Sequence, residues 1–170
     1  MMIYNMNVII LDSLKEKDFN YLLSLLQKIT IPKKSKTNNR RGFKIHRATT
    51  LGITRGRFNG ITQLSNFSKK YPIIYQEVIR IGKLCCPFDF NSIQLNHNVV
   101  CPKHTDSKNV NDSVLISFGD YTGCNIVIND KIYDAKYTPI MFDGRTLEHY
   151  NTDDLVGDKY SLVFFNGEKC

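Results

Sequence analysis

Short apolar segments separated by turn-forming residues dominate the second half of the chain. From residue 91 onward, aliphatic and aromatic residues recur in brief runs, and glycine, asparagine and aspartate lie between them. Runs this short and this frequent predict an antiparallel sandwich or barrel rather than a parallel sheet. The predicted strands cover residues 92–100, 114–118, 125–128, 131–133, 139–142, 148–150 and 159–165, with turns at 119–123 and 129–130.

The strand predicted at residues 159–165 is apolar on both faces, which is typical of a strand that is buried on both sides. Alternate residues of a strand point to the same face. The two faces carry Lys159, Ser161, Val163 and Phe165 on one side and Tyr160, Leu162 and Phe164 on the other. We predict that the first set lines the interior of a barrel, polar at its mouth, and that the second set packs outward against a helix.

Helical periodicity is found in the first half of the chain. Residues 13–16 have the Ser-x-x-Glu form of a capping box, and the apolar residues that follow, up to Ile29, lie on one helical face. A second helix is predicted over residues 72–82, with proline at its start and glycine at its end. Strands are predicted at 7–11 and 43–54, and we expect the two helices to pack on the outside of one sheet.

The charge of the chain is unevenly distributed. The formal net charge is +7, yet residues 19–76 contain twelve Lys or Arg and no Asp or Glu, which leaves −5 for the remainder. This basic segment, residues 19–76, includes Arg40 and Arg41. It is either a solvated basic face or a contact surface for a polyanion, most simply nucleic acid.

Length and composition predict one soluble, monomeric domain, since 170 residues with 42% hydrophobic content can bury a core. Residues 1–90 would form a helical, basic support region and residues 91–167 the β core. No apolar run approaches the ~20 residues that span a bilayer. The five cysteines are an odd number without framework spacing, which favours reduced thiols in the cytoplasm or nucleus.

One histidine and one aspartate stand two residues apart in the predicted strand region. His104 and Asp106 would therefore project to the same face. A second histidine arriving from another strand, His149, would complete two nitrogens and one oxygen on one face of an octahedron. This facial triad leaves coordination positions open on non-haem Fe(II).

The order of these residues, followed by Lys159 and Ser161, resembles the Fe(II)/2-oxoglutarate-dependent dioxygenases over residues 92–167. The resemblance implies a mostly β (α+β) fold, a double-stranded β-helix of jelly-roll or cupin-like form backed by N-terminal helices. It also implies Fe(II), 2-oxoglutarate and O2, with the far carboxylate of 2-oxoglutarate on Lys159 and Ser161. Two interpretations of Asn96 and Asn98 are open. They contact the cosubstrate or the groups around the iron, or they are ordinary polar residues at a strand edge.

Residues 98–106 and 117–123 look like the TET and J-binding-protein group, whose members oxidise the 5-methyl group of pyrimidines in nucleic acid. This resemblance implies 5-methylcytosine or thymine as the substrate. Two departures are Lys159, where that group has arginine, and Cys124, where a glycine is expected. Prolyl hydroxylases often have lysine at the position of Lys159, so a protein side-chain hydroxylase is the alternative. A non-catalytic nucleic-acid-binding β-barrel is a third possibility.

Several further residues are candidates for the substrate side. Asn109 and Tyr121 flank the motif strands, and Arg40 and Arg41 belong to the basic segment. Arg145 precedes the distal histidine by four residues, where it would contact substrate or stiffen its loop by pairing with Asp143 or Glu148. His46 and His97 are expected to be structural or surface residues.

Overall fold

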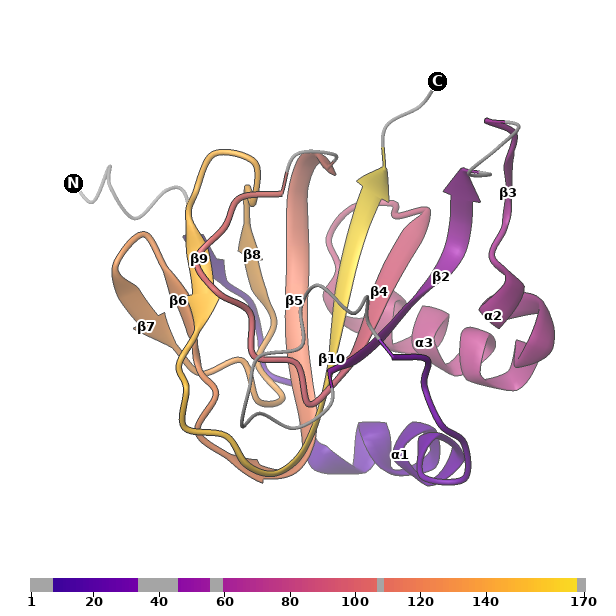
Figure 1. Ribbon diagram of the computed structural model, residues 1–170, viewed down its shortest axis with the longest axis horizontal. Coiled ribbons are helices and arrows are strands. Elements are labelled where there is room, and N and C mark those ends of the chain that lie inside the picture. The colour runs from indigo at the N-terminus through magenta and orange to yellow at the C-terminus, as the bar shows by residue number, and fades with distance from the viewer. Residues whose placement is uncertain (1–7, 34–45, 56–59, 107–108, 168–170) are drawn as a thin grey trace.

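Two antiparallel sheets form the framework of the computed structural model, which describes residues 8–33, 46–55, 60–106 and 109–167. The larger sheet has seven strands in the order β1-β8-β5-β10-β4-β2-β3, and the smaller has three in the order β7-β6-β9 (Figure 1). The strands of the larger sheet, in that order, are Val8–Ile10, Ile140–Phe142, Asn109–Thr122, Val156–Gly167, Ser92–His97, Arg47–Arg55 and Thr62–Leu64. Those of the smaller are Lys131–Tyr133, Ile126–Ile128 and His149–Asn151.

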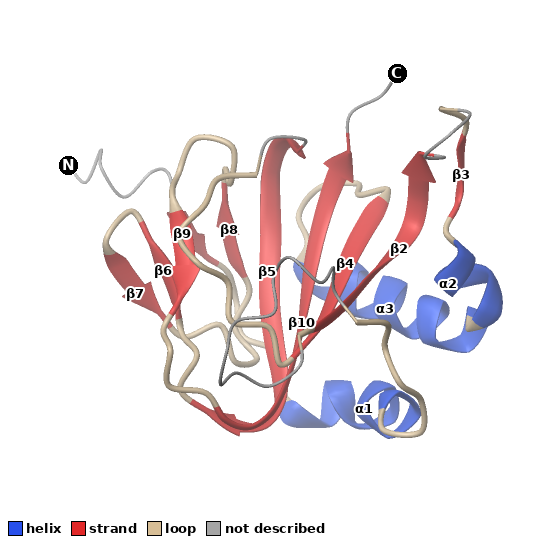
Figure 2. Cartoon of the chain, viewed as in Figure 1, coloured by secondary structure: helices blue, strands red, loops and turns tan. Residues whose placement is uncertain are grey.

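Helices cover one face of the larger sheet (Figure 2). They are the 3-10 helix η2 (Glu16–Phe19) and the α-helices α1 (Asn20–Leu26), α2 (Asn66–Lys70) and α3 (Pro72–Cys85). Tyr160, Leu162 and Phe164 of β10 are buried in one cluster with apolar residues of α1 and α3. The predicted outward face of this strand is therefore confirmed, as is the placement of helices outside one sheet.

The strand predictions are confirmed in position, although several strands have other limits. β5 continues through the predicted turn at 119–123 as far as Thr122, because residues 119–122 pair with residues 156–159 of β10. The hairpin between β6 and β7 turns at Asn129 and Asp130, whose φ angles are +49° and +66°. Positive φ at both central residues is the geometry of a tight hairpin turn, which Asn and Asp tolerate.

The capping box predicted at Ser13 is wrong. The helical segment begins after Lys15, whose backbone N–H donates to the Asp18 carboxylate at 2.8 Å. The Ser13 hydroxyl instead lies 2.8 Å from that of Thr138. The cap is thus shifted by two residues, to the position from which Asp18 reaches back.

Gly82 does not end the second helix, which continues to Cys85. A Cβ at Gly82 would overlap the Phe90 ring and come within 2.6 Å of the Phe164 ring. The glycine therefore lets α3 pack closely on the sheet. The short elements α2 and β3 were not predicted, and residues 43–45 of the predicted strand at 43–54 lie outside the described residues.

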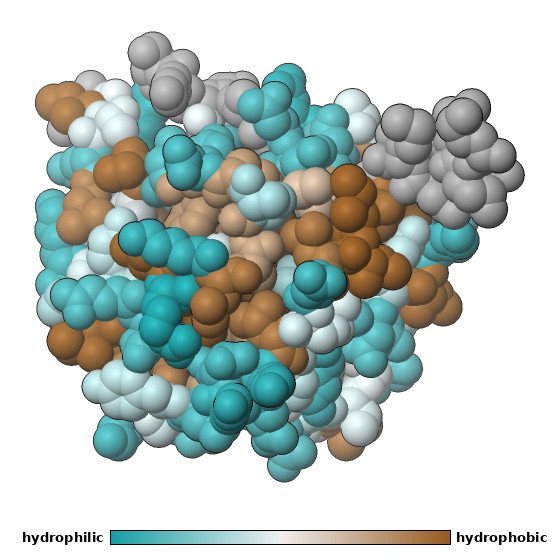
Figure 3. Space-filling model, turned by 180° about the vertical axis from the view of Figure 1, so that it is seen from behind, coloured by the Kyte–Doolittle hydropathy of each residue, from teal (hydrophilic) through white to brown (hydrophobic). Residues whose placement is uncertain are grey.

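The face seen from behind carries a central band of hydrophobic side chains bordered by hydrophilic ones (Figure 3). No described helix is long and apolar enough to cross a membrane. Within the described ranges, the cysteines at 85, 86, 101 and 124 form no disulfide.

Candidate active site

Backbone hydrogen bonds bring the two histidines of the predicted triad side by side. His104 donates its N–H to the carbonyl of His149 at 3.0 Å, and His149 donates to the carbonyl of His104 at the same distance. His104 thus forms one isolated bridge rather than part of a regular strand, which corrects the prediction of a strand through the motif. Asp106 is fixed by its own N–H, which donates to the Gly144 carbonyl at 2.7 Å.

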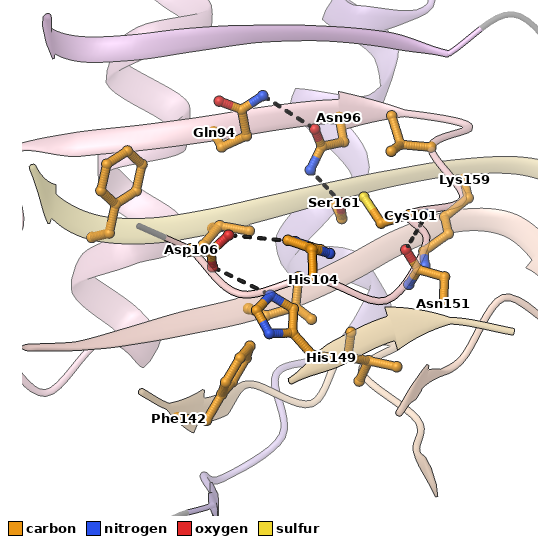
Figure 4. A pocket seen from close by; sticks show the side chains of 15 residues that line it. Gln94, Asn96, Cys101, His104, Asp106, Phe142, His149, Asn151, Lys159 and Ser161 are labelled. Atoms are coloured by element: carbon orange, nitrogen blue, oxygen red, sulfur yellow. Dashed lines mark hydrogen bonds and ion pairs between the residues drawn. The ribbon is translucent and has the colours of Figure 1, made fainter. Parts of the chain in front are cut away.

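The three side chains converge on one point (Figure 4). Nε2 of His104 lies 3.4 Å from Oδ1 of Asp106, and Nε2 of His149 lies 3.2 Å from Oδ2. One ligand atom from each residue falls within 4.8 Å of the other two. Two imidazole nitrogens and one carboxylate oxygen, so placed, are the donor set of a facial triad.

The outer nitrogens of both imidazoles are occupied by the backbone. Nδ1 of His104 lies 2.7 Å from the Pro102 carbonyl, and Nδ1 of His149 lies 2.8 Å from the Leu147 carbonyl. Because Nδ1 of each ring is held by a carbonyl, Nε2 is the nitrogen that each ring turns toward the Asp106 carboxylate. Without a metal, a proton on Nε2 can be shared with the carboxylate; with a metal, the Nε2 lone pairs and the carboxylate oxygen are ligands, so the residues fit a divalent metal.

The Asp106 carboxyl is held in its ionised form. Partial burial opposes ionisation, but hydrogen bonds and charge interactions with His104 and His149 outweigh it and lower the pKa of Asp106 well below its usual value. The carboxylate is therefore available as a metal ligand throughout the neutral range.

A cavity of about 340 Å³ lies between the two sheets and contains the triad. Its volume is at the lower end of the range for small-molecule sites. The lining residues are Gln94, Asn96, Val99, Cys101, His104, Asp106, Leu115, Ile126, Phe142, His149, Asn151, Lys159, Ser161, Val163 and Phe165. The predicted inward face of β10, from Lys159 to Phe165, thus lines this cavity.

Lys159 forms the cationic end of the cavity. The residue is 6% exposed, and its Nζ donates to the Cys124 carbonyl at 2.7 Å and lies 3.3 Å from Cys124 Sγ. Among the described residues, no carboxylate forms an ion pair with it. A buried ammonium without an anionic partner is costly. The site therefore fits an anionic ligand that reaches Lys159 and the neighbouring Ser161.

Cys124 adopts a φ of +52°, in the left-handed region that glycine occupies without steric cost. This conformation explains why a glycine is expected at this position. This backbone conformation directs the Cys124 carbonyl toward Lys159 Nζ, which donates a hydrogen bond to it.

The two asparagines of the motif strand have different surroundings. Asn96 lines the cavity and donates Nδ2–H to Ser161 Oγ at 3.2 Å. Asn98 does not belong to the lining. Its side chain accepts from the Lys159 N–H at 2.8 Å and donates to Asp158 at 3.0 Å, so it holds β10 against the end of β4.

The substrate-side candidates are dispersed. Tyr121 is buried behind the cationic end, with its ring centre 5.5 Å from Lys159 Nζ. Arg145 is exposed, and its backbone N–H, not its guanidinium, donates to Asp143 at 3.0 Å. The backbone of Asn109 begins β5, opposite Gly167, whereas Arg40 and Arg41 lie outside the described residues.

His46 is buried, and His97 pairs with Asp158 at 2.6 Å and stacks on Tyr160. Neither histidine belongs to the His-Asp-His group. Both therefore have the structural or surface character expected from the sequence.

Four polar or supporting residues of the site were not predicted: Gln94, Cys101, Gly144 and Asn151. Gln94 is two residues before Asn96 on β4, and Asn151 is two residues after His149 on β9. Strand alternation was the signal that places both on a lining face. Cys101 and Gly144 lie in loops, where no such periodicity applies.

Gly144 provides the space that the Asp106 carboxylate occupies. A Cβ at this position would overlap Oδ2 of Asp106 and lie 3.3 Å from Cε1 of His149. We expect Gly144→Ala to displace the carboxylate and weaken metal binding by about 10–100-fold, the usual cost of disturbing the support of a metal ligand. Equilibrium metal titration measures the effect.

Gly167→Ala is the matched control, because a Cβ there would meet nothing closer than the Phe165 ring at 3.9 Å. Metal affinity equal to wild type in both variants would contradict this role of Gly144.

The two sheets with a His-Asp-His group between them form a double-stranded β-helix, the jelly-roll fold of Fe(II)/2-oxoglutarate oxygenases. Among solved structures, the chain is similar to NgTET1 in complex with 5mC DNA, with a TM-score of 0.64 and 14% identity over 95% of this chain and 72% of that one. The predicted fold is thereby confirmed.

Two further structures share the fold. One is an oxidoreductase of the 2OG-Fe(II) oxygenase family from Burkholderia pseudomallei, with a TM-score of 0.58 and 14% identity over 96% of this chain and 85% of that one. The other is a Pseudomonas putida prolyl-4-hydroxylase, with a TM-score of 0.58 and 9% identity over 98% and 96%. No protein-family model and no curated protein matches the sequence.

Proposed function

We propose that this chain is an Fe(II)/2-oxoglutarate-dependent dioxygenase. The observation that carries the proposal is one cavity with a His-Asp-His group in its wall and, at one end, a buried lysine that pairs with no carboxylate of the described residues. His104, Asp106 and His149 would hold Fe(II), and Lys159 and Ser161 would bind the far carboxylate of 2-oxoglutarate. When bound, the metal supplies oxidation of a substrate by O2, coupled to conversion of 2-oxoglutarate into succinate and CO2.

The protein's own residues bind the cosubstrate and exclude water from it. The Lys159 ammonium supplies a charge-assisted hydrogen bond that is strengthened by burial. Leu115, Ile126 and Val163 line the cavity beside the polar groups, so a bound cosubstrate is largely desolvated. Incubation with Fe(II) and 2-oxoglutarate should yield succinate, and chelation of the metal should stop it.

We further propose that the substrate is a pyrimidine 5-methyl group, 5-methylcytosine or thymine, in nucleic acid. The uninterrupted positive charge of residues 19–76 supports this, as does the fold shared with NgTET1, whose structure contains 5mC DNA. A base in a duplex must leave the stack to enter a cavity of this kind. Arg40 and Arg41 would then contact phosphates, and Asn109, Tyr121 and Arg145 stay predictions for the substrate side.

A protein side-chain hydroxylase is the second candidate, favoured by Lys159 and by the fold shared with a prolyl-4-hydroxylase. A binding module without catalysis has no need of three converging metal ligands, and is therefore disfavoured. Methylated DNA, methylated RNA and peptide pools, incubated with Fe(II) and 2-oxoglutarate, separate these candidates by which of them gains one oxygen atom in mass spectrometry.

Neutralising Lys33, Lys34, Lys36, Arg40 and Arg41 together should weaken nucleic-acid binding without changing metal or 2-oxoglutarate binding. The logarithm of the binding constant decreases linearly with the logarithm of the salt concentration. For every phosphate that the variant no longer binds, this dependence should become shallower by roughly 0.9 on duplex DNA or about 0.7 on a single strand. Binding isotherms at several salt concentrations measure the slope.

Replacing Lys15, Lys17 and Lys83, which are exposed on the helical side, controls for net charge when it is compared with replacement of Lys33, Lys34 and Lys36 alone, because each variant then loses three positive charges. If wild type binds no nucleic acid even at low salt, the base-hydroxylase proposal fails and the peptide alternative takes its place.

A further inference from the structure

A continuous chain of hydrogen bonds runs across three strands to the cosubstrate end of the cavity. Thr50 Oγ1 donates to Gln94 Oε1 at 3.1 Å, Gln94 Nε2 donates to Asn96 Oδ1 at 3.3 Å, and Asn96 Nδ2 donates to Ser161 Oγ at 3.2 Å. Figure 4 shows its last two bonds. Neither Thr50 nor Gln94 was predicted from the sequence to belong to the site.

Sheet register holds the four side chains in line. Thr50 of β2 is directly opposite Gln94 of β4, and Asn96 is directly opposite Ser161 of β10. Gln94 and Asn96 share a face because they are two residues apart. The chain is therefore built into the sheet.

Each end of the chain is a hydroxyl, which can donate or accept, and each amide can turn to exchange its N–H and C=O groups. Two polarities are thus compatible with the same positions. In one, Asn96 donates to Ser161, whose hydrogen is directed elsewhere. In the other, Ser161 donates to Asn96 and has no hydrogen left for a ligand.

An anionic ligand selects the first polarity. Among the described residues, no protein group accepts a hydrogen bond from Ser161, whose side chain lines the cavity together with Lys159. We propose that Gln94 and Asn96 are positioning residues that direct the Ser161 hydroxyl hydrogen at the far carboxylate of 2-oxoglutarate, with Thr50 anchoring the outer end. This inference rests on the proposed function, because it takes 2-oxoglutarate as the anion.

Gln94→Glu tests the inference from two hydrogen bonds away. The carboxylate introduced at position 94 offers no N–H to Asn96, so the Asn96 amide turns its N–H toward that carboxylate and its carbonyl toward Ser161. The Ser161 hydroxyl then donates to Asn96 instead of the cosubstrate. We expect about tenfold weaker 2-oxoglutarate binding, the effect of losing one hydrogen bond to a charged group.

Gln94→Met removes the hydrogen bonds from Thr50 to residue 94 and from residue 94 to Asn96, but it does not reverse the direction of the bond between Asn96 and Ser161. We expect a change of less than about threefold, because the hydrogen bond from Ser161 to the cosubstrate carboxylate is kept. Asn96→Asp places an acceptor directly against Ser161 and should weaken binding at least as much as Gln94→Glu. In both acidic variants the 2-oxoglutarate requirement should rise while kcat at saturation stays near wild type.

A double-mutant cycle with Ser161→Ala separates this mechanism from simple repulsion between the new carboxylate and the cosubstrate. Calorimetry of 2-oxoglutarate binding to the Fe(II)-loaded protein without oxygen is the readout, with metal affinity and melting temperature as folding controls. We expect Gln94→Glu to lose most of its effect when Ser161 is absent.

An equal effect of Gln94→Glu with and without Ser161, or no effect at all, would overturn the inference and leave the proposed function intact. Wild-type protein that binds Fe(II) but no 2-oxoglutarate would overturn the proposed function, and the inference with it.

Discussion

His149→Ala is expected to abolish Fe(II) binding and 2-oxoglutarate turnover while the fold is retained. His149 is 5% exposed and supplies one of only three protein ligands in the described His-Asp-His group, so loss of its imidazole leaves two donors on an open site. The bridge between residues 104 and 149 is made by backbone atoms and survives truncation of the side chain. Metal analysis after gel filtration and a succinate assay measure the two losses.

His104→Ala and Asp106→Ala should have the same effect, because all three residues act as one unit. His97→Gln is the control, since His97 pairs with Asp158 and stacks on Tyr160 outside the cavity. Circular dichroism distinguishes loss of metal from loss of fold. Wild-type succinate production by His149→Ala would show that another residue is the distal ligand.

The alternation along β10 made its two faces predictable from the sequence. Lys159, Ser161, Val163 and Phe165 line the cavity, while the residues between them pack under the helices. This inference succeeded because the period of a strand is two, and both faces of this strand are buried. The relation between His104 and Asp106 was also anticipated, although one bridge and a loop, not a strand, hold them.

Pairing between distant strands was not predictable from one sequence. β10 lies between β5 and β4, and β1 pairs with β8 across most of the chain. Local periodicity carries no information on such partners, so the chain of hydrogen bonds from Thr50 to Ser161 could not be foreseen. Loop residues that support the metal ligands could not be predicted for the same reason, as Gly144 beside Asp106 illustrates.

Boundary errors have local causes. Ser13 matched a capping pattern, but Asp18 reaches the N–H of Lys15 instead. Gly82 resembled a helix end, yet its missing side chain admits the rings of Phe90 and Phe164. A neighbouring side chain decides the first boundary, whereas packing of α3 on the sheet decides the second.

Lys159→Met is expected to weaken 2-oxoglutarate binding while the metal-free protein becomes no less stable. The ammonium is buried and, within the described ranges, has no carboxylate partner. Burying a charge without an anionic partner costs free energy, and an apolar side chain of similar size does not carry that cost. The same change removes a charge-assisted bond to the cosubstrate, so we expect about 10–100-fold weaker binding.

Ligand-induced stabilisation displays the two effects together. At one hundred times the wild-type Kd, 2-oxoglutarate should add about 2.7 kcal/mol to the free energy of unfolding of wild type, but only about 0.4 kcal/mol if the variant binds a hundredfold more weakly. Lys136→Met is the matched control, because Lys136 lies over the same Tyr121 ring but outside the cavity lining. Unchanged 2-oxoglutarate affinity in Lys159→Met would remove Lys159 from the cosubstrate site, whereas a large loss of stability would show that its ammonium is satisfied by the protein alone.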